Sequence, residues 1–156
     1  MKILMVCLGN ICRSPLAMAI LQKKANKQSL NITIDSAGFE PYHNGDYADK
    51  RSIDVAKKHN IDLHSHRARL FRHSDFDEYD KIYVMDYANY VDVKNASRKK
   101  EEMLKVDFIL NSIYPNENRP IPDPYYGGKD GFENVYNLLD KATDKIIEQI
   151  KSNDDR

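Results

Sequence analysis

The stretch VCLGNICRSP, residues 6–15, gathers residue types that suit anion chemistry better than packing. Gly9 and Asn10 tolerate the left-handed backbone conformations that a tight wrap needs. A wrap of this kind can point successive backbone N–H groups inward at an anion. Arg13 can bind two oxygens of one phosphate at once. The stretch therefore predicts a phosphate-binding loop.

A thiol within such a loop would be an activated nucleophile. The inward amides, the positive end of the following helix and Arg13 would all stabilise a thiolate at Cys7, so we expect a pKa well below ~8.5 for this thiol. A thiolate that faces a bound phosphoryl group would yield a cysteinyl-phosphate. Ser14 is suited both to donate its hydroxyl to the thiolate and to cap the helix that Pro15 begins.

Other interpretations of these residues are weaker. Taken alone, a Cys-x5-Arg spacing is common by chance, and Cys7 at a strand end would be a buried core cysteine. A nucleotide loop of the Gly-x4-Gly-Lys-Ser/Thr kind lacks its lysine and its second glycine here. A metal site formed by Cys7, Cys12 and a histidine lacks a closely spaced second pair of ligands.

A phosphatase also needs a proton donor for the leaving oxygen. The candidate is Asp123 in the sequence IPDPYYGG, where Pro122 and Pro124 restrict the backbone and can fix the carboxylate over the pocket. Tyr125 and Tyr126 follow, and their rings can wall a slot for an aromatic group. Taken singly, these are an ordinary turn aspartate and ordinary loop tyrosines.

Composition limits the class of protein. With 156 residues, of which 41% are hydrophobic and 31% charged, the chain suits one soluble globular domain over residues 1–156. The 24 basic and 24 acidic residues cancel, which gives no argument for binding to nucleic acid or to an anionic membrane. We expect a cytoplasmic protein, because we find neither a signal-peptide pattern nor a membrane span.

The elements that must position these residues are strands that alternate with helices. This order predicts an α/β fold, a parallel sheet with helices on both faces. Ligands of such sheets bind at the carboxyl ends of the strands, and Cys7 follows the first strand directly. We predict strands over 3–6, 31–35, 81–85 and 106–110, helices from Ser14, over 49–59 and over 132–150, and a frayed tail over 151–156.

At these residues the chain resembles the low-molecular-weight protein tyrosine phosphatases. VCLGNICRSP is similar to the phosphate-binding loop of that family, and DPYYGG is similar to its general-acid loop. The resemblance continues in order through DSAG, SHRAR, MDYAN and GFENVYNLL. It implies a four-stranded parallel sheet flanked by helices on both faces, with the phosphate-binding loop after the first strand.

The resemblance implies hydrolysis of phosphotyrosine in proteins, or of small aryl phosphates, without metal or cofactor. Cys7 would attack phosphorus while Asp123 protonates the phenolate, and Asp123 would then activate water to break the thiophosphate. Arg13 and the loop amides would hold the equatorial oxygens.

The resemblance also implies roles for residues around this centre. Asn10, Ser14, Ser36 and His66 would form a hydrogen-bond network that keeps the loop in shape. Cys12 resembles the family's second cysteine, which pairs reversibly with the nucleophile and would make the protein redox-regulated. The residues expected to bind substrate are Leu8, Gly9, Asn10, Ile11, Cys12, Ser14, Tyr42, Tyr125 and Tyr126.

Two residues depart from the family pattern, and four match no catalytic position. Met18 stands where the family usually has glutamate, so we expect changed stability rather than lost activity. Tyr42 stands at the pocket rim, where many members have tryptophan. We expect the remaining histidines to be solvated, namely His43, His59, His64 and His73.

Sister activities remain as alternatives. Arsenate reductases that use a similar loop relay a disulfide through downstream cysteines, and this chain has none after Cys12. Phosphoarginine phosphatases tend to carry threonine at the position of Ile11, whose apolar bulk favours an aromatic substrate. A phosphate-binding module without activity would lack the nucleophile, the arginine or the acid, and Cys7, Arg13 and Asp123 are all present.

Overall fold

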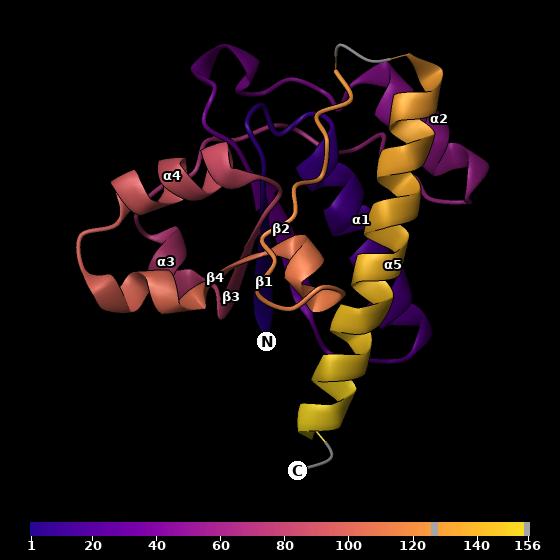
Figure 1. The fold of residues 1–156 in the computed structure, drawn as a ribbon. Coiled ribbons are helices and arrows are strands. Elements are labelled where there is room, and N and C mark those ends of the chain that lie inside the picture. The colour runs from indigo at the N-terminus through magenta and orange to yellow at the C-terminus, as the bar shows by residue number, and fades with distance from the viewer. Residues whose placement is uncertain (126–127, 155–156) are drawn as a thin grey trace.

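Four parallel strands form one sheet in the order β2-β1-β3-β4 (Figure 1). The protein is described here by a computed structural model, which covers residues 1–125 and 128–154. β1 is central and pairs with β2 on one side, Ile3 opposite Ile34, and with β3 on the other, Leu4 opposite Ile82. The strands are β1 (Lys2–Val6), β2 (Thr33–Ala37), β3 (Lys81–Val84) and β4 (Val106–Phe108).

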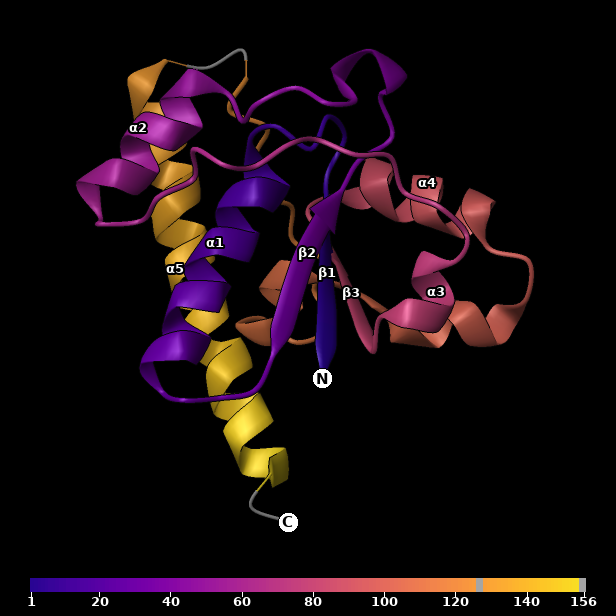
Figure 2. The same cartoon turned by 180° about the vertical axis from the view of Figure 1, so that it is seen from behind.

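Helices cover both faces of the sheet (Figures 1 and 2). One face carries α1 (Arg13–Lys27), α2 (Lys50–Lys58) and α5 (Lys129–Asp154), and the other carries α3 (Asp75–Glu78) and α4 (Tyr87–Ala96). Short 3₁₀ helices occupy Pro41–His43, Lys100–Lys105 and Ile109–Ser112. Within the described ranges, no helix has both the length and the apolar character that a membrane crossing requires.

The continuous apolar run of β1 follows from this coverage. Ile3 and Met5 are buried in the core beneath α1 and α5, whereas Leu4 and Val6 are buried in a second core with Phe76 of α3. A strand in the middle of a parallel sheet has no solvent face, so polar residues do not alternate with apolar ones. The two cores stabilise the sheet from both sides.

The carboxyl ends of three strands meet at one edge of the sheet. Val6 of β1 lies between Ala37 of β2 and Val84 of β3 in the register. The residues that follow these strands therefore emerge together, at the upper edge in Figure 1. This edge carries the candidate site.

The predicted parallel sheet with helices on both faces is confirmed, and several element ends were wrong. β2 continues to Ala37, and β4 ends at Phe108 because Ile109 begins a 3₁₀ helix. Residues 151–154, predicted to fray, continue α5. Buried Ile150 anchors that turn, and Lys151 Nζ donates to Gln28 Oε1 at 2.8 Å.

Candidate active site

The loop between β1 and α1 is wrapped tightly, as its residue types predict. Asn10 adopts a left-handed backbone with φ of 56°, whereas Gly9 does not. Gly38, directly after β2, allows the wrap to lie close. A Cβ atom there would stand 2.8 Å from the Leu8 carbonyl oxygen and 2.9 Å from the Asn10 nitrogen. Phe39 N donates to the same Leu8 oxygen at 2.7 Å, which pins the loop to β2.

A directed chain of hydrogen bonds ends at the Cys7 sulfur. The amide of Arg69 can only donate, and it lies 3.0 Å from Asn10 Oδ1, so the Asn10 Nδ2 group faces Ser14. Asn10 Nδ2 donates to Ser14 Oγ at 2.8 Å. Because the Ser14 oxygen accepts this hydrogen bond, its hydroxyl proton is available to donate to Cys7 Sγ, which lies 2.9 Å away. Ser14 N donates to the same sulfur at 3.5 Å.

Ser14 does not cap the helix, which corrects the prediction. α1 begins at Arg13, and the N-cap position falls on Cys12 without a side-chain cap. The Ser14 hydroxyl is instead buried and engaged with Asn10 and Cys7. Its bond to sulfur replaces the helix cap that the Ser-Pro pair suggested.

His66 supports the loop from behind, while Ser36 shows no such contact. His66 Nε2 donates to the Asn10 carbonyl oxygen at 2.8 Å. Burial lowers the pKa of His66, which favours the neutral ring with its proton on Nε2. Ser36 is buried at the end of β2, and its hydroxyl has no hydrogen-bond partner among the residues that the structure describes. Among the described residues, the hydrogen-bond network around the loop therefore includes Asn10, Ser14 and His66 but not Ser36.

Arg13 is held by a residue that we did not predict as part of the site. Its Nη1 donates to Asp86 Oδ2 at 2.7 Å and to the Ile121 carbonyl oxygen at 2.8 Å. Its Nη2 lies 3.7 Å from Asp123 Oδ2. Asp86 lies two residues after the end of β3 and so stands at the same sheet edge as Cys7. In the sequence, the acidic residue directly after the predicted strand 81–85 was the signal that could have identified Asp86 as part of the site.

The segment that bears Asp123 is fastened to the end of β3. Ile121 is fully buried, and its amide donates to the Met85 carbonyl oxygen at 2.8 Å. Tyr125 N donates to Asp123 Oδ1 at 3.0 Å, which orients the carboxylate. The Arg51 guanidinium of α2 lies 5.4 Å from the centre of the Tyr125 ring. Tyr126, the other predicted slot residue, lies outside the described residues.

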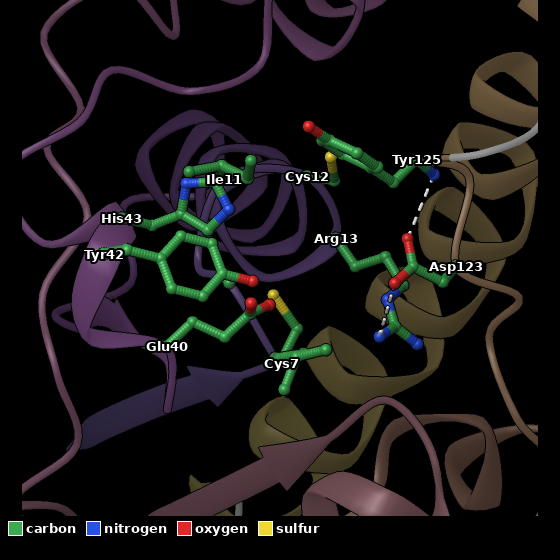
Figure 3. A pocket seen from close by; sticks show the side chains of 11 residues that line it. Cys7, Ile11, Cys12, Arg13, Glu40, Tyr42, His43, Asp123 and Tyr125 are labelled. Atoms are coloured by element: carbon green, nitrogen blue, oxygen red, sulfur yellow. Dashed lines mark hydrogen bonds and ion pairs between the residues drawn. The ribbon is translucent and has the colours of Figure 1, made fainter.

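These side chains line a cavity of about 370 Å³ (Figure 3). A cavity of that size suits a small ligand. Two further lining residues, Glu40 and His43, were not predicted. Asn10 and Ser14 are fully buried behind the wall that they support. The predicted residues that line the cavity are Cys7, Leu8, Gly9, Ile11, Cys12, Arg13, Tyr42, Asp123 and Tyr125.

Three of the four histidines predicted to be solvated are half-buried against other residues. His43 lies in the cavity wall, close enough that a Cβ on Gly9 would stand 3.1 Å from its ring. His59 stacks on the Tyr136 ring, with a centroid separation of 3.7 Å. His73 Nε2 lies 2.6 Å from Glu102 Oε2. Only His64 is exposed as expected. These partners are distant in sequence, so local patterns could not reveal them.

Cys12 is buried in the cavity wall, and both cysteines are free thiols. Burial raises the pKa of Cys12, and the nearby Asp49 carboxylate raises it further. The start of α2 holds this part of the loop, because Asp49 N donates to the Ile11 carbonyl oxygen at 2.8 Å. Within residues 1–125 and 128–154, no three His, Cys, Asp or Glu side chains are grouped to hold a metal ion.

Comparison with known proteins agrees with this geometry. The family described as low molecular weight phosphotyrosine protein phosphatase matches residues 2–156. The chain belongs to this family. Its members are cysteine-dependent hydrolases, and the Cys7 thiol in the cavity wall is consistent with a cysteine nucleophile.

Similar proteins extend over almost the whole chain. The low molecular weight phosphotyrosine protein phosphatase of Schizosaccharomyces pombe is 37% identical and covers 96% of each chain. A protein tyrosine phosphatase structure from Entamoeba histolytica, with Hepes in its active site, has a TM-score of 0.91, 35% identity and 99% coverage of each chain. A Drosophila arginine phosphatase has a TM-score of 0.89 and 30% identity, and the match covers 97% of this chain and 98% of that one.

Met18, at the usual glutamate position of the family, lies away from the cavity. It is half-buried on α1 and packs against the core. Met18 instead lines a separate surface cleft, which His66 also lines. The expectation that activity survives this departure stays a prediction.

Proposed function

We propose that this family member hydrolyses phosphotyrosine, in proteins or in small aryl phosphates, through a cysteinyl-phosphate. One observation carries the proposal: the Cys7 sulfur, the Arg13 guanidinium and the Asp123 carboxylate converge on one cavity. Cys7 and Arg13 come from the segment that runs from β1 into α1, Asp123 comes from a distant segment of the chain, and each group matches a step that the reaction requires.

In the first step the Cys7 thiolate attacks phosphorus. The S–P bond forms, the bond from phosphorus to the phenolic oxygen breaks, and Asp123 gives its proton to that oxygen. Arg13 and the loop amides neutralise the charge on the equatorial oxygens. Asp86 and the Ile121 carbonyl hold Arg13 at 2.7 and 2.8 Å, so its guanidinium is oriented before substrate arrives.

In the second step water releases phosphate. Asp123, now a carboxylate, takes a proton from water as the water oxygen attacks phosphorus. The S–P bond breaks, and its electron pair returns to the Cys7 sulfur. The Ser14 hydroxyl, 2.9 Å from that sulfur, stabilises the departing thiolate.

The cavity walls support an aromatic substrate. Tyr42 and Tyr125 are exposed at the mouth, and Ile11 adds an apolar surface. A phenyl ring between such walls buries apolar area that a phosphoserine side chain lacks. Cys7 and Cys12, as free thiols, suit a reducing compartment such as the cytoplasm.

Phosphoarginine is a second candidate substrate. Similarity to the Drosophila arginine phosphatase is the observation that favours it. Ile11 in the cavity wall favours phosphotyrosine over phosphoarginine, because its side chain offers no hydrogen bond to a guanidinium.

Matched peptides that carry phosphotyrosine, phosphoserine or phosphoarginine test the proposal, with reductant and without added metal. We expect turnover of phosphotyrosine alone, abolished by Cys7→Ser and slowed by about 10²–10⁴-fold by Asp123→Ala. Asp54→Asn, which removes an exposed carboxylate from α2, serves as the control and should match the parent. Preferred turnover of phosphoarginine would overturn the substrate, and full activity of Cys7→Ser would overturn the mechanism.

A further inference from the structure

A second carboxylate enters the cavity from the wall opposite Asp123 (Figure 3). It belongs to Glu40, which is half-buried between β2 and the 3₁₀ helix Pro41–His43. In the part of the chain that the structure describes, the Glu40 side chain has no hydrogen bond or ion pair. The reaction proposed above does not use this group.

The backbone fixes Glu40 over the phosphate-binding loop. Phe39 N donates to the Leu8 carbonyl oxygen, and the Phe39 ring stacks on Phe71 with centroids 5.3 Å apart. His43 N donates to the Glu40 carbonyl oxygen at 3.2 Å. Glu40 Oε1 lies only 3.5 Å from the point that a Cβ on Gly9 would occupy. The carboxylate is therefore held close to the loop that receives the phosphoryl group.

The charges that line the cavity do not neutralise Glu40. Arg13 is paired with Asp86 at 2.7 Å and lies 3.7 Å from Asp123. The His43 ring is already bonded through Nδ1 to Asp46 at 3.0 Å. An unpaired carboxylate beside a phosphoryl dianion repels it, unless the substrate brings a positive charge of its own.

We propose that Glu40 determines specificity, favouring phosphotyrosine that has a lysine or arginine directly beside it in the peptide. This inference rests on the proposed function. Peptide neighbours of a phosphotyrosine held by Cys7 must lie at the cavity mouth, where Leu8 and Tyr42 are exposed. A long basic side chain can reach from there towards Glu40 and offset the repulsion. An acidic neighbour in the peptide would instead add to the repulsion between Glu40 and the substrate.

Three phosphotyrosine peptides that differ only in the adjacent residue test this: arginine, alanine or glutamate. We expect the parent to prefer the arginine peptide over the glutamate peptide by about three- to tenfold in kcat/KM, mostly through KM, as for a partly exposed ion pair. Glu40→Gln should narrow this ratio to about twofold or less. Glu101→Gln, which removes an exposed charge on the 3₁₀ helix Lys100–Lys105, should keep the full preference.

Titration with inorganic phosphate gives an independent readout. Glu40→Gln should bind phosphate more tightly than the parent, by about threefold, whereas Glu101→Gln should not. Equal turnover of the three peptides by the parent, a preference that survives Glu40→Gln, or unchanged phosphate affinity in that variant would each overturn the inference. No turnover of the alanine peptide would instead refute the proposed function, and the phosphate titration would still decide the effect of Glu40.

Discussion

Replacing Asp86 by asparagine should impair catalysis while leaving the fold intact. Asp86 has two tasks, one for each carboxylate oxygen. Oδ2 accepts from Arg13 Nη1 at 2.7 Å, and Oδ1 accepts from Asn89 N at 2.9 Å, which caps α4. Asparagine caps a helix about as well as aspartate does. The substitution therefore removes the charge that orients Arg13 and keeps the cap.

The size of the effect follows from the burial of the two groups. A hydrogen bond between charged groups contributes about 1.5–3 kcal/mol. The Arg13 side chain is 3% exposed and that of Asp86 is 24% exposed, so solvent screens the pair only in part. Taking about 2 kcal/mol and applying all of it to the transition state, kcat/KM should fall about thirtyfold.

Steady-state kinetics on a phosphotyrosine peptide measures the effect, and urea unfolding checks the fold. Asp86→Asn should lower kcat/KM mainly through kcat and should shift the unfolding midpoint little. Asp54→Asn on the exposed side of α2 controls for loss of one negative charge. If kcat/KM of Asp86→Asn stays within about twofold of the parent, the orienting role of Asp86 is wrong.

Three further outcomes follow from the site. Burial lowers the pKa of His66, so on acidification the unfolded chain binds a proton at a higher pH than the folded chain does. The free energy of unfolding should therefore fall as the pH drops below about 6.5, and it should fall less in His66→Gln. Urea unfolding midpoints at several pH values will measure both. Gly38→Ala should reduce the free energy of unfolding by about 1–3 kcal/mol and lower activity, because the added Cβ would collide with the phosphate-binding loop. The control Gly128→Ala places its Cβ in open space and should leave the urea unfolding midpoint unchanged. Peroxide should join Cys7 to Cys12 in a disulfide that thiols reverse; mass spectra that show only sulfinic or sulfonic acid at Cys7 would contradict this.

Local patterns predicted the parts of the fold whose burial is regular. The apolar run of β1 reflects burial on both faces, and the stripe of α5 reflects one long contact with the core. Helix α4 escaped prediction because only Asn89 and Val93 of its residues are buried, which leaves no apolar stripe to detect. α3 is a single turn of four residues, too short for any periodic signal.

The candidate site was predictable where its residues are neighbours in sequence. The loop that contains Cys7 and Arg13 is one continuous motif, and the proline-flanked Asp123 is another. Asp86 was missed because it acts through Arg13, 73 positions earlier in the chain. Glu40 was missed for a similar reason, since only the fold brings its segment over the phosphate-binding loop.

The most direct test of the mechanism is to trap the covalent intermediate. The protein would be mixed with a phosphotyrosine peptide, quenched in acid within one turnover, digested and analysed by mass spectrometry. We expect the mass of one phosphoryl group on the peptide that contains Cys7, a longer-lived signal in Asp123→Ala, and no signal in Cys7→Ser. Turnover of phosphotyrosine with no label on Cys7, or with label on another residue, would contradict the account.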